Sequence, residues 1–217
     1  MQQTALTFKT RSASLEGVLS LPDEAGTSVP GVVLGHSHPV LGGTMDEPVM
    51  IELVRALSQA GMATLRFNFG GVSSGPDGPS KENPGLDDMR SAVKLLKGWR
   101  GIDGKRLALV GYSFGAQVVL QGLRHFKAAR AMVLISPPLP SLTTSADAGP
   151  AVGMDRRPRL FLAGDKDRLA NVDALRERVA AFSQQADFVV VPGADHSWRG
   201  HETELARQVT DFLARVL

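Results

Sequence analysis

Short apolar runs alternate with amphipathic segments along most of the chain. Runs that suit buried strands occupy Gly31–Gly35, Met62–Phe69, Arg106–Gly111, Ala131–Ser136, Arg159–Gly164 and Phe188–Val191. Segments with helical spacing of apolar residues follow them: the stretch from Asp46 to Gly61, then Leu86–Trp99, Ser113–Phe126, Val172–Gln184 and Glu202–Leu217. This alternation predicts a mostly parallel, doubly wound α/β sheet with helices on both faces.

The beginning of the chain follows a different pattern. Ala5–Thr10 and Leu15–Leu21 each alternate between apolar and polar residues, which predicts an antiparallel pair of strands. The sheet is therefore expected to have about seven to eight strands. Asp46 has the position of a helix N-cap, because Pro48 suits the first turn and Glu47 favours the positive end of the helix.

Two segments are rich in Gly, Ser and Pro and lack helical or strand periodicity. They are Gly70–Gly85 and Pro137–Pro158. The second is too short for a full helical lid, so we expect an open site whose specificity depends on both loops. No internal repeat and no linker divides the sequence. We therefore expect one domain over residues 1–217, without a substantial lid.

Composition narrows the function classes. The 217 residues are 43% hydrophobic and 21% charged, and they contain no cysteine, which excludes disulfides, thiol catalysis and thiolate metal sites. The net charge is +2 with interleaved signs, so no nucleic-acid partner is expected. The densest basic cluster, Arg156, Arg157 and Arg159, is interpreted as a solvated loop.

The start of the chain lacks a signal-peptide pattern, and no apolar run approaches membrane-spanning length. We expect a cytoplasmic protein without a membrane partner, present as a monomer or a homodimer.

The candidate nucleophile is Ser113. An apolar run, Leu107–Val110, leads into Gly111-Tyr112-Ser113-Phe114-Gly115, and a helix-forming stretch follows at once. In such a strand–turn–helix, the two glycines let the strand and the helix approach closely, and the serine hydroxyl is raised above the end of the sheet. The helix N-terminus also aims its dipole and N–H groups at the same place. A bare Gly-x-Ser-x-Gly also occurs in ordinary small-residue turns, and the flanking strand and helix favour the catalytic interpretation.

A serine nucleophile needs a base and a group that orients the base. Two later strand ends can supply them. Gly164-Asp165-Lys166-Asp167 follows one strand, and Gly193-Ala194-Asp195-His196 follows the last. His196 is the candidate base, while His201 is interpreted as a helix-start residue and Asp195 as a loop-shaping one. Serine, aspartate and histidine occur in the chain order expected of an α/β-hydrolase.

Further stretches resemble the α/β-hydrolases over essentially the whole chain. They are His36-Ser37-His38-Pro39 with Gly42-Gly43-Thr44-Met45-Asp46, Leu65-Arg66-Phe67-Asn68-Phe69, and Gly193-Ala194-Asp195-His196. More narrowly, the chain resembles small, lidless bacterial serine hydrolases related to dienelactone hydrolases. The family pattern Gly-x-x-Asp implies that Asp167, rather than Asp165, is the triad acid. Relatives tend to have an arginine where this chain has Gly70, so a substrate-anchoring role there is not carried over.

The resemblance implies an oxyanion hole built from backbone N–H groups. Phe114 is expected to supply one, and either Ser37 or His38 the other. The pair His36 and His38 also suggests a metal site, but no third ligand lies at suitable spacing, so no metal and no cofactor are expected. The alternative for His36 is a hydrogen-bonded brace of its loop.

The sequence thus predicts a serine hydrolase that cleaves small or short-acyl carboxylic esters through Ser113, His196 and Asp167. A thioesterase, a peptidase or an acyltransferase would use the same triad. A non-catalytic binding module on a hydrolase scaffold is the alternative from another class.

Overall fold

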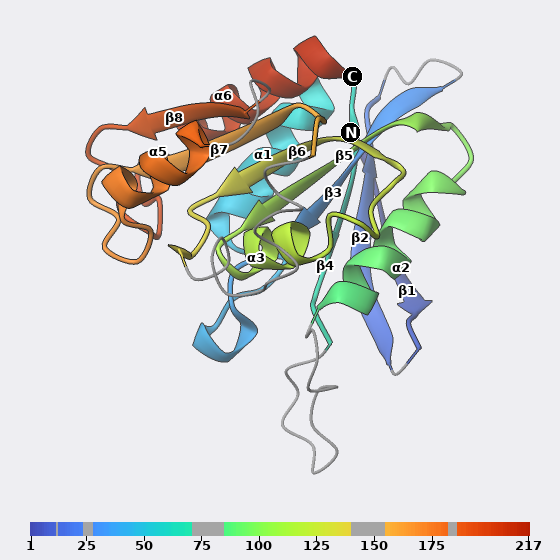
Figure 1. Ribbon diagram of the computed structural model, residues 1–217. Coiled ribbons are helices and arrows are strands. Elements are labelled where there is room, and N and C mark those ends of the chain that lie inside the picture. The colour runs from blue at the N-terminus through green and yellow to red at the C-terminus, as the bar shows by residue number, and fades with distance from the viewer. Residues whose placement is uncertain (12, 24–27, 71–84, 140–154, 182–185) are drawn as a thin grey trace.

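An eight-stranded sheet forms the centre of the molecule in the computed structural model, which describes residues 1–11, 13–23, 28–70, 85–139, 155–181 and 186–217 (Figure 1). The strands are β1 (Gln2–Lys9), β2 (Ser14–Leu21), β3 (Val29–Gly35), β4 (Ala63–Phe67), β5 (Ile102–Tyr112), β6 (Ala129–Ile135), β7 (Arg159–Gly164) and β8 (Ala186–Val191). Their order across the sheet is β1-β2-β4-β3-β5-β6-β7-β8. Strand β2 is antiparallel to both of its neighbours, and all other pairs are parallel. The predicted fold class is confirmed.

Helices cover both faces of this sheet. They are α1 (Pro48–Gln59), α2 (Leu86–Lys97), α3 (Phe114–Gln121), α5 (Val172–Ala180) and α6 (Glu202–Val216), and a short 3-10 helix, η1, spans Pro39–Leu41. Buried residues of α2, α3 and α5 share one apolar core, while those of α1 and α6 share the other. Figure 1 shows α1 and α6 side by side, in agreement with their mutual contacts.

The central strands are buried on both faces, which is why they appear as continuous apolar runs. In β3, Val33 belongs to the core under α2 and α3, while Val32 and Leu34 belong to the core under α1 and α6. Complete burial of each such side chain contributes about 1.5–3 kcal/mol. The apolar stripe of each helix is therefore held against one face of the sheet, and the carboxyl ends of β3, β5, β6, β7 and β8 meet along one edge.

The predicted N-cap of α1 is wrong by one residue. The cap position belongs to Glu47, not Asp46, and no side chain caps this helix. Asp46 instead forms an ion pair with the buried guanidinium of Arg66 in β4. Glu47 instead accepts a hydrogen bond from the Ser37 N–H in the loop after β3. Both acidic side chains therefore bind residues of other segments, Arg66 and Ser37, instead of the N–H groups at the start of the helix.

Some predicted boundaries also move. Helix α3 ends at Gln121 rather than Phe126, because Gly122 allows the Phe126 ring to close over the backbone; a Cβ there would lie 2.2 Å from that ring. Strand β5 begins at Ile102 rather than Arg106. Helix α5 ends at Ala180, before the predicted Gln184, which lies outside the described residues.

The interpretation of the arginine cluster as a solvated loop is wrong for two of its three members. Arg156 is exposed, but Arg159 is fully buried and Arg157 is half-buried. Arg157 pairs with Asp155 and donates to three backbone carbonyls, those of Leu123, Phe126 and Ala129. These contacts tie the segment from the end of α3 to the start of β6 to the residues just before β7. The cluster therefore has a structural function.

Most of the two predicted specificity loops, residues 71–84 and 140–154, lies outside the described residues. None of the helices in the described part of the chain has the length and apolar character needed to cross a membrane.

Candidate active site

Ser113 lies at the sharp turn between β5 and α3. Its backbone has φ 51° and ψ −105°, a left-handed conformation that non-glycine residues seldom adopt. The flanking glycines make the turn possible. A Cβ on Gly111 would lie 2.4 Å from the backbone of Gly115, and one on Gly115 would lie 2.2 Å from the carbonyl oxygen of Gly35. The strand, the helix and the loop after β3 thus converge at Ser113.

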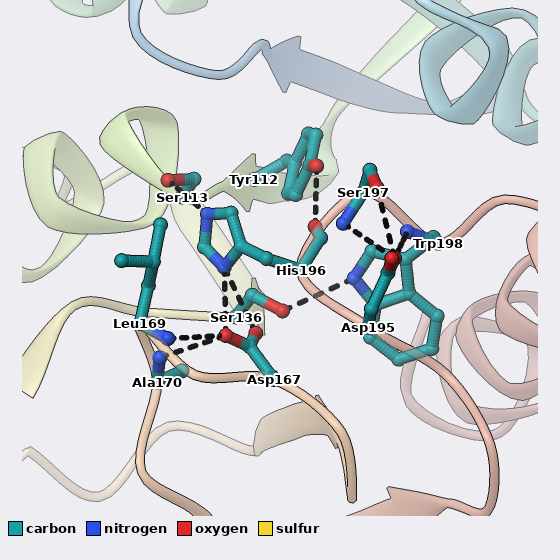
Figure 2. A network of polar contacts seen from close by, with 10 residues as sticks. All are labelled: Tyr112, Ser113, Ser136, Asp167, Leu169, Ala170, Asp195, His196, Ser197 and Trp198. Carbon is teal, nitrogen blue, oxygen red and sulfur yellow. Dashed lines mark hydrogen bonds and ion pairs between the residues drawn. The ribbon is translucent and has the colours of Figure 1, made fainter.

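The structure brings Ser113, His196 and Asp167 into one hydrogen-bonded chain (Figure 2). His196 Nε2 is 2.9 Å from Ser113 Oγ, and His196 Nδ1 is 2.9 Å and 3.0 Å from the two carboxylate oxygens of Asp167. The three residues come from the ends of β5, β7 and β8, and up to 83 positions of sequence separate them. This arrangement can pass a proton from the serine to the histidine while the carboxylate stabilises the imidazolium.

Asp167 is buried and well supplied with donors. Its Oδ1 accepts from the backbone N–H groups of Leu169 at 2.9 Å and Ala170 at 2.8 Å. Burial would raise the pKa of this carboxyl, but hydrogen bonds from His196, from the Ala170 N–H and from the Ser136 side chain outweigh it, and the pKa is lowered. Asp167 is therefore ionised at neutral pH.

Asp165 and Asp195 both shape loops, the function expected of Asp195 from the sequence. Asp165 Oδ1 accepts from the N–H of Gly193 at 2.7 Å, which links the loops after β7 and β8. Asp195 accepts from the backbone N–H groups of Ser197 and Trp198 and from the Ser197 hydroxyl, so it closes the turn that carries His196. Neither carboxylate contacts the His196 ring through a hydrogen bond.

Tyr112 supports His196 from the opposite side. Its hydroxyl donates to the backbone carbonyl of His196 at 2.6 Å (Figure 2). Burial raises the pKa of this phenol, and the negative charges of Glu47, Asp167 and Asp195 raise it further, so it remains a proton donor. The backbone of the histidine loop is thereby fixed relative to β5.

The loop after β3 lies against the turn that carries Ser113. The Gly115 N–H donates to the His36 carbonyl at 3.1 Å, and the rings of His38 and Phe114 pack with centroids 4.9 Å apart. Within the described ranges, the backbone N–H groups of His38 and Phe114 have no acceptor. The N–H of Ser37, in contrast, donates to Glu47 Oε2 at 3.1 Å.

His36 braces this loop. Its Nδ1 donates to the Ser37 carbonyl at 2.7 Å, and its Nε2 accepts from the Phe69 N–H at 3.1 Å. Burial lowers the pKa of His36 to about 4, which keeps the ring neutral. Both ring nitrogens are committed to backbone groups, and His38 Nδ1 accepts from the Val40 N–H at 3.2 Å. No cluster of three or more His, Cys, Asp or Glu side chains suited to a metal ion occurs among the described residues.

A hollow opens beside the His196 side of the triad. Arg168, Leu169 and Ser197 line it together with Asp167 and His196 themselves. Leu169 is 63% exposed, a high fraction for a large apolar side chain. Charged side chains, among them Asp165, Lys166 and Asp195, make up the rest of the lining, so the hollow borders the Asp167–His196 pair and is lined mostly by polar residues.

Sequence reasoning missed the supporting residues Tyr112, Ser136, Trp198 and Glu47. Tyr112 and Trp198 lie within two positions of Ser113 and His196, so proximity in sequence was the available signal. For Glu47 and Ser136 the chain offered none, because their contacts join segments that meet only in the folded sheet.

Comparison with known proteins identifies the family of this chain. The profile described as "Alpha/beta hydrolase domain" matches residues 31–215. An uncharacterized protein of Mycobacterium tuberculosis (strain CDC 1551 / Oshkosh) is 30% identical over 196 residues, which are 81% of this chain and 66% of that protein.

Solved structures share the fold over nearly the whole chain. A lidless α/β serine hydrolase from Xanthomonas campestris has a TM-score of 0.83 at 24% identity, with 100% of this chain and 95% of that chain covered. An α/β serine hydrolase homologue from Coxiella burnetii has a TM-score of 0.79 at 26% identity, with 97% of each chain covered. A dienelactone hydrolase from Anabaena variabilis superimposes with a TM-score of 0.78 at 18% identity, over 100% of this chain and 98% of that one, a likeness of fold alone.

Proposed function

Because the chain belongs to the α/β-hydrolase family, we propose that it is a serine hydrolase that cleaves carboxylic esters through Ser113, His196 and Asp167. The observation that carries the proposal is the unbroken hydrogen-bonded chain from Ser113 Oγ through the His196 ring to the ionised Asp167. A binding module would have no use for a strained nucleophile turn with a base in hydrogen-bond contact.

In the first half of the reaction, Ser113 Oγ attacks the ester carbonyl and its proton passes to His196 Nε2. The carbonyl π electrons move to oxygen and form the tetrahedral oxyanion. Collapse of this intermediate breaks the bond to the alkoxy oxygen, which takes the proton from His196 and leaves as the alcohol. His196 Nε2, 2.9 Å from Ser113 Oγ, is placed to give that proton to the leaving oxygen.

In the second half, a water molecule gives a proton to His196 and attacks the acyl-enzyme carbonyl. The new tetrahedral intermediate releases the carboxylic acid, and the proton returns to Ser113 Oγ. No oxidant, metal or cofactor takes part in either step. Asp167 stays ionised throughout and stabilises the imidazolium form of His196.

The oxyanion hole is proposed to consist of the N–H groups of Phe114 and His38. Both are without an acceptor in the described residues, and their rings are in contact. Ser37, the other candidate, has its N–H engaged by Glu47. Donors aimed at the developing oxyanion are usually the largest single contribution to transition-state stabilisation in acyl transfer.

A matched panel of acyl substrates tests the proposal. Purified protein is incubated with a fluorophosphonate probe and then assayed with acetyl and butyryl groups carried as an oxygen ester, a thioester and an anilide. We expect covalent labelling at Ser113 and the highest kcat/KM for the oxygen esters. Labelling combined with faster thioester or anilide cleavage would mean a thioesterase or a peptidase. Absence of both labelling and turnover would refute the enzyme proposal.

A further inference from the structure

Glu47 lies half-buried at the start of α1 and binds one residue of the facing loop twice. Its Oε2 accepts the Ser37 backbone N–H at 3.1 Å, and its Oε1 accepts the Ser37 hydroxyl. On the other side, the Ser37 carbonyl accepts a hydrogen bond from His36 Nδ1 at 2.7 Å. The backbone N–H, the hydroxyl and the carbonyl of Ser37 are therefore all held.

These contacts set the direction of the next N–H group. The peptide unit between Ser37 and His38 is planar and trans, so its N–H points opposite to its C=O. With the carbonyl held by His36, the His38 N–H has one orientation. The following carbonyl, that of His38, accepts from the N–H groups of Leu41 at 2.9 Å and Gly43 at 3.1 Å, which fixes the far side of the residue.

We infer that Glu47 is a positioning residue of the oxyanion hole: by holding Ser37 it directs the His38 N–H toward the reacting carbonyl. The inference rests on the proposed function and adds to it a side chain that touches neither substrate nor triad through a hydrogen bond. It also explains why His38, and not Ser37, is the available donor.

The placement of Glu47 is difficult to explain by its own helix. An acidic residue at an N-cap ordinarily accepts from the first free N–H groups, yet no side chain caps α1. Burial raises the pKa of Glu47, and the hydrogen bonds from Ser37 and the charge of His196 lower it by less, so the net shift is upward. Stability alone would favour a capping contact here. The chain instead places a carboxylate in a partly buried position against the loop.

The loop is closely packed around Ser37. A Cβ on Gly43 would lie 2.4 Å from the Ser37 carbonyl oxygen, so the loop backbone at Gly43 lies directly against that at Ser37. Removing Glu47 leaves the Ser37 N–H and hydroxyl without their acceptor. We expect Ser37 to turn toward other partners and to move the Ser37–His38 peptide with it.

Two substitutions at Glu47 separate positioning from bulk. Glu47→Leu keeps a side chain of similar width but removes both acceptors. Glu47→Gln keeps the arrangement, since the amide oxygen can accept the Ser37 N–H and the amide N–H can donate to the Ser37 hydroxyl. Glu52→Gln is the matched control, because it removes a carboxylate from the same helix whose partners, among the described residues, are Arg55 and Thr203.

We expect Glu47→Leu to lower kcat by about 10- to 100-fold, less than or equal to the loss of a whole oxyanion donor, with KM changed little. Affinity for a trifluoromethyl ketone, which forms an oxyanion on Ser113, is expected to fall by the same factor as kcat/KM. Glu47→Gln and Glu52→Gln are expected to retain most of both. Ser37→Ala, a smaller change that removes one of the two bonds to Glu47, is expected to give a partial loss.

An active wild type whose Glu47→Leu variant keeps its kcat, or loses kcat without losing affinity for the ketone, overturns this inference alone. If Glu47→Leu does not fold, unchanged kcat and ketone affinity in Ser37→Ala overturn it instead. A wild type that neither reacts with a fluorophosphonate nor hydrolyses esters overturns the proposed function, and this inference with it.

Discussion

The indole N–H of Trp198 donates to the hydroxyl of Ser136 at 3.1 Å (Figure 2). The Ser136 side chain also hydrogen-bonds the carboxylate of Asp167. Trp198 and Ser136 are fully buried, and their backbones have positive φ, 60° for Trp198 and 46° for Ser136. The contact joins the loop that carries His196 to the end of β6. The proposed acid and the proposed base are therefore supported by one buried contact between their loops.

Trp198→Phe is expected to weaken this link while filling most of the same space. Loss of one buried hydrogen bond costs about 1 kcal/mol of unfolding free energy, and the hydroxyl of Ser136 loses its donor. We expect a lower kcat as well, because Asp167 and His196 lose a common support. Urea unfolding and ester kinetics measure both effects. Trp99→Phe, at the half-buried tryptophan outside the site, is the control. Equal effects of the two substitutions would contradict a role for Trp198 at the site.

Ser113→Ala is expected to abolish fluorophosphonate labelling and to lower ester turnover by about 10⁶-fold, the loss typical of a triad nucleophile. The fold should remain, because the turn conformation depends on Gly111 and Gly115 rather than on the hydroxyl. Circular dichroism and intact-mass analysis check both statements. Turnover close to that of the wild type would move the nucleophile elsewhere.

Asp167→Asn and Asp165→Asn form a matched pair. Asparagine at 167 cannot hold the imidazole in the required tautomer or stabilise its charge, so a loss of about 10⁴-fold in kcat is expected. At position 165 the amide oxygen can still accept the Gly193 N–H, so most activity should remain. Steady-state kinetics on both folded variants decides the assignment, and the reverse ranking would make Asp165 the acid.

His36 makes stability depend on pH in a predictable direction. Its pKa in the folded protein is about 4, below the value of 6.5 for a free histidine. Between those values the unfolded chain binds a proton that the folded chain does not, so stability is full above pH 6.5 and falls as the pH falls toward 4. The slope from this residue is about 1.4 kcal/mol per pH unit.

Urea unfolding at pH 7, 6 and 5 measures this dependence. His36→Asn removes the titrating group and should show a shallower loss of stability over that range, although it is less stable at pH 7. His125→Asn, at an exposed histidine, serves as the control. Parallel curves for the wild type and His36→Asn would show that the ring is not the source of the dependence.

Acyl-chain preference is expected to favour short groups. Large apolar side chains near the site are open to solvent: Leu169 is 63% exposed, Val40 69% and Leu41 81%. A methylene gains about 0.8 kcal/mol only when fully buried, so an open rim captures little of it. Values of kcat/KM for p-nitrophenyl acetate, butyrate, octanoate and palmitate should decrease along the series. A maximum at octanoate or beyond would indicate an apolar channel.

The local sequence pattern was sufficient to predict which strands and helices exist, the mostly parallel sheet and the sharp turn at Ser113. The period of apolar residues distinguishes strands from helices without any partner, because it reflects which side of each element is buried. The spacing of Gly111, Ser113 and Gly115 reports a backbone geometry that few other residues permit. The order of Ser113, Asp167 and His196 along the chain then places them at strand ends that a parallel sheet brings to one edge.

Contacts between distant segments were decided only by the tertiary structure. The pairing of Glu47 with Ser37 occupies the N–H of one oxyanion candidate and is the reason that His38 is proposed instead. The pairing of Asp46 with Arg66 takes Asp46 away from the helix cap. Arg157 turns inward to the carbonyls at the end of α3 instead of facing solvent. In each case a polar side chain had several possible partners in sequence. The packed sheet selected one, because a partly buried charge or N–H must be satisfied by whichever group lies beside it.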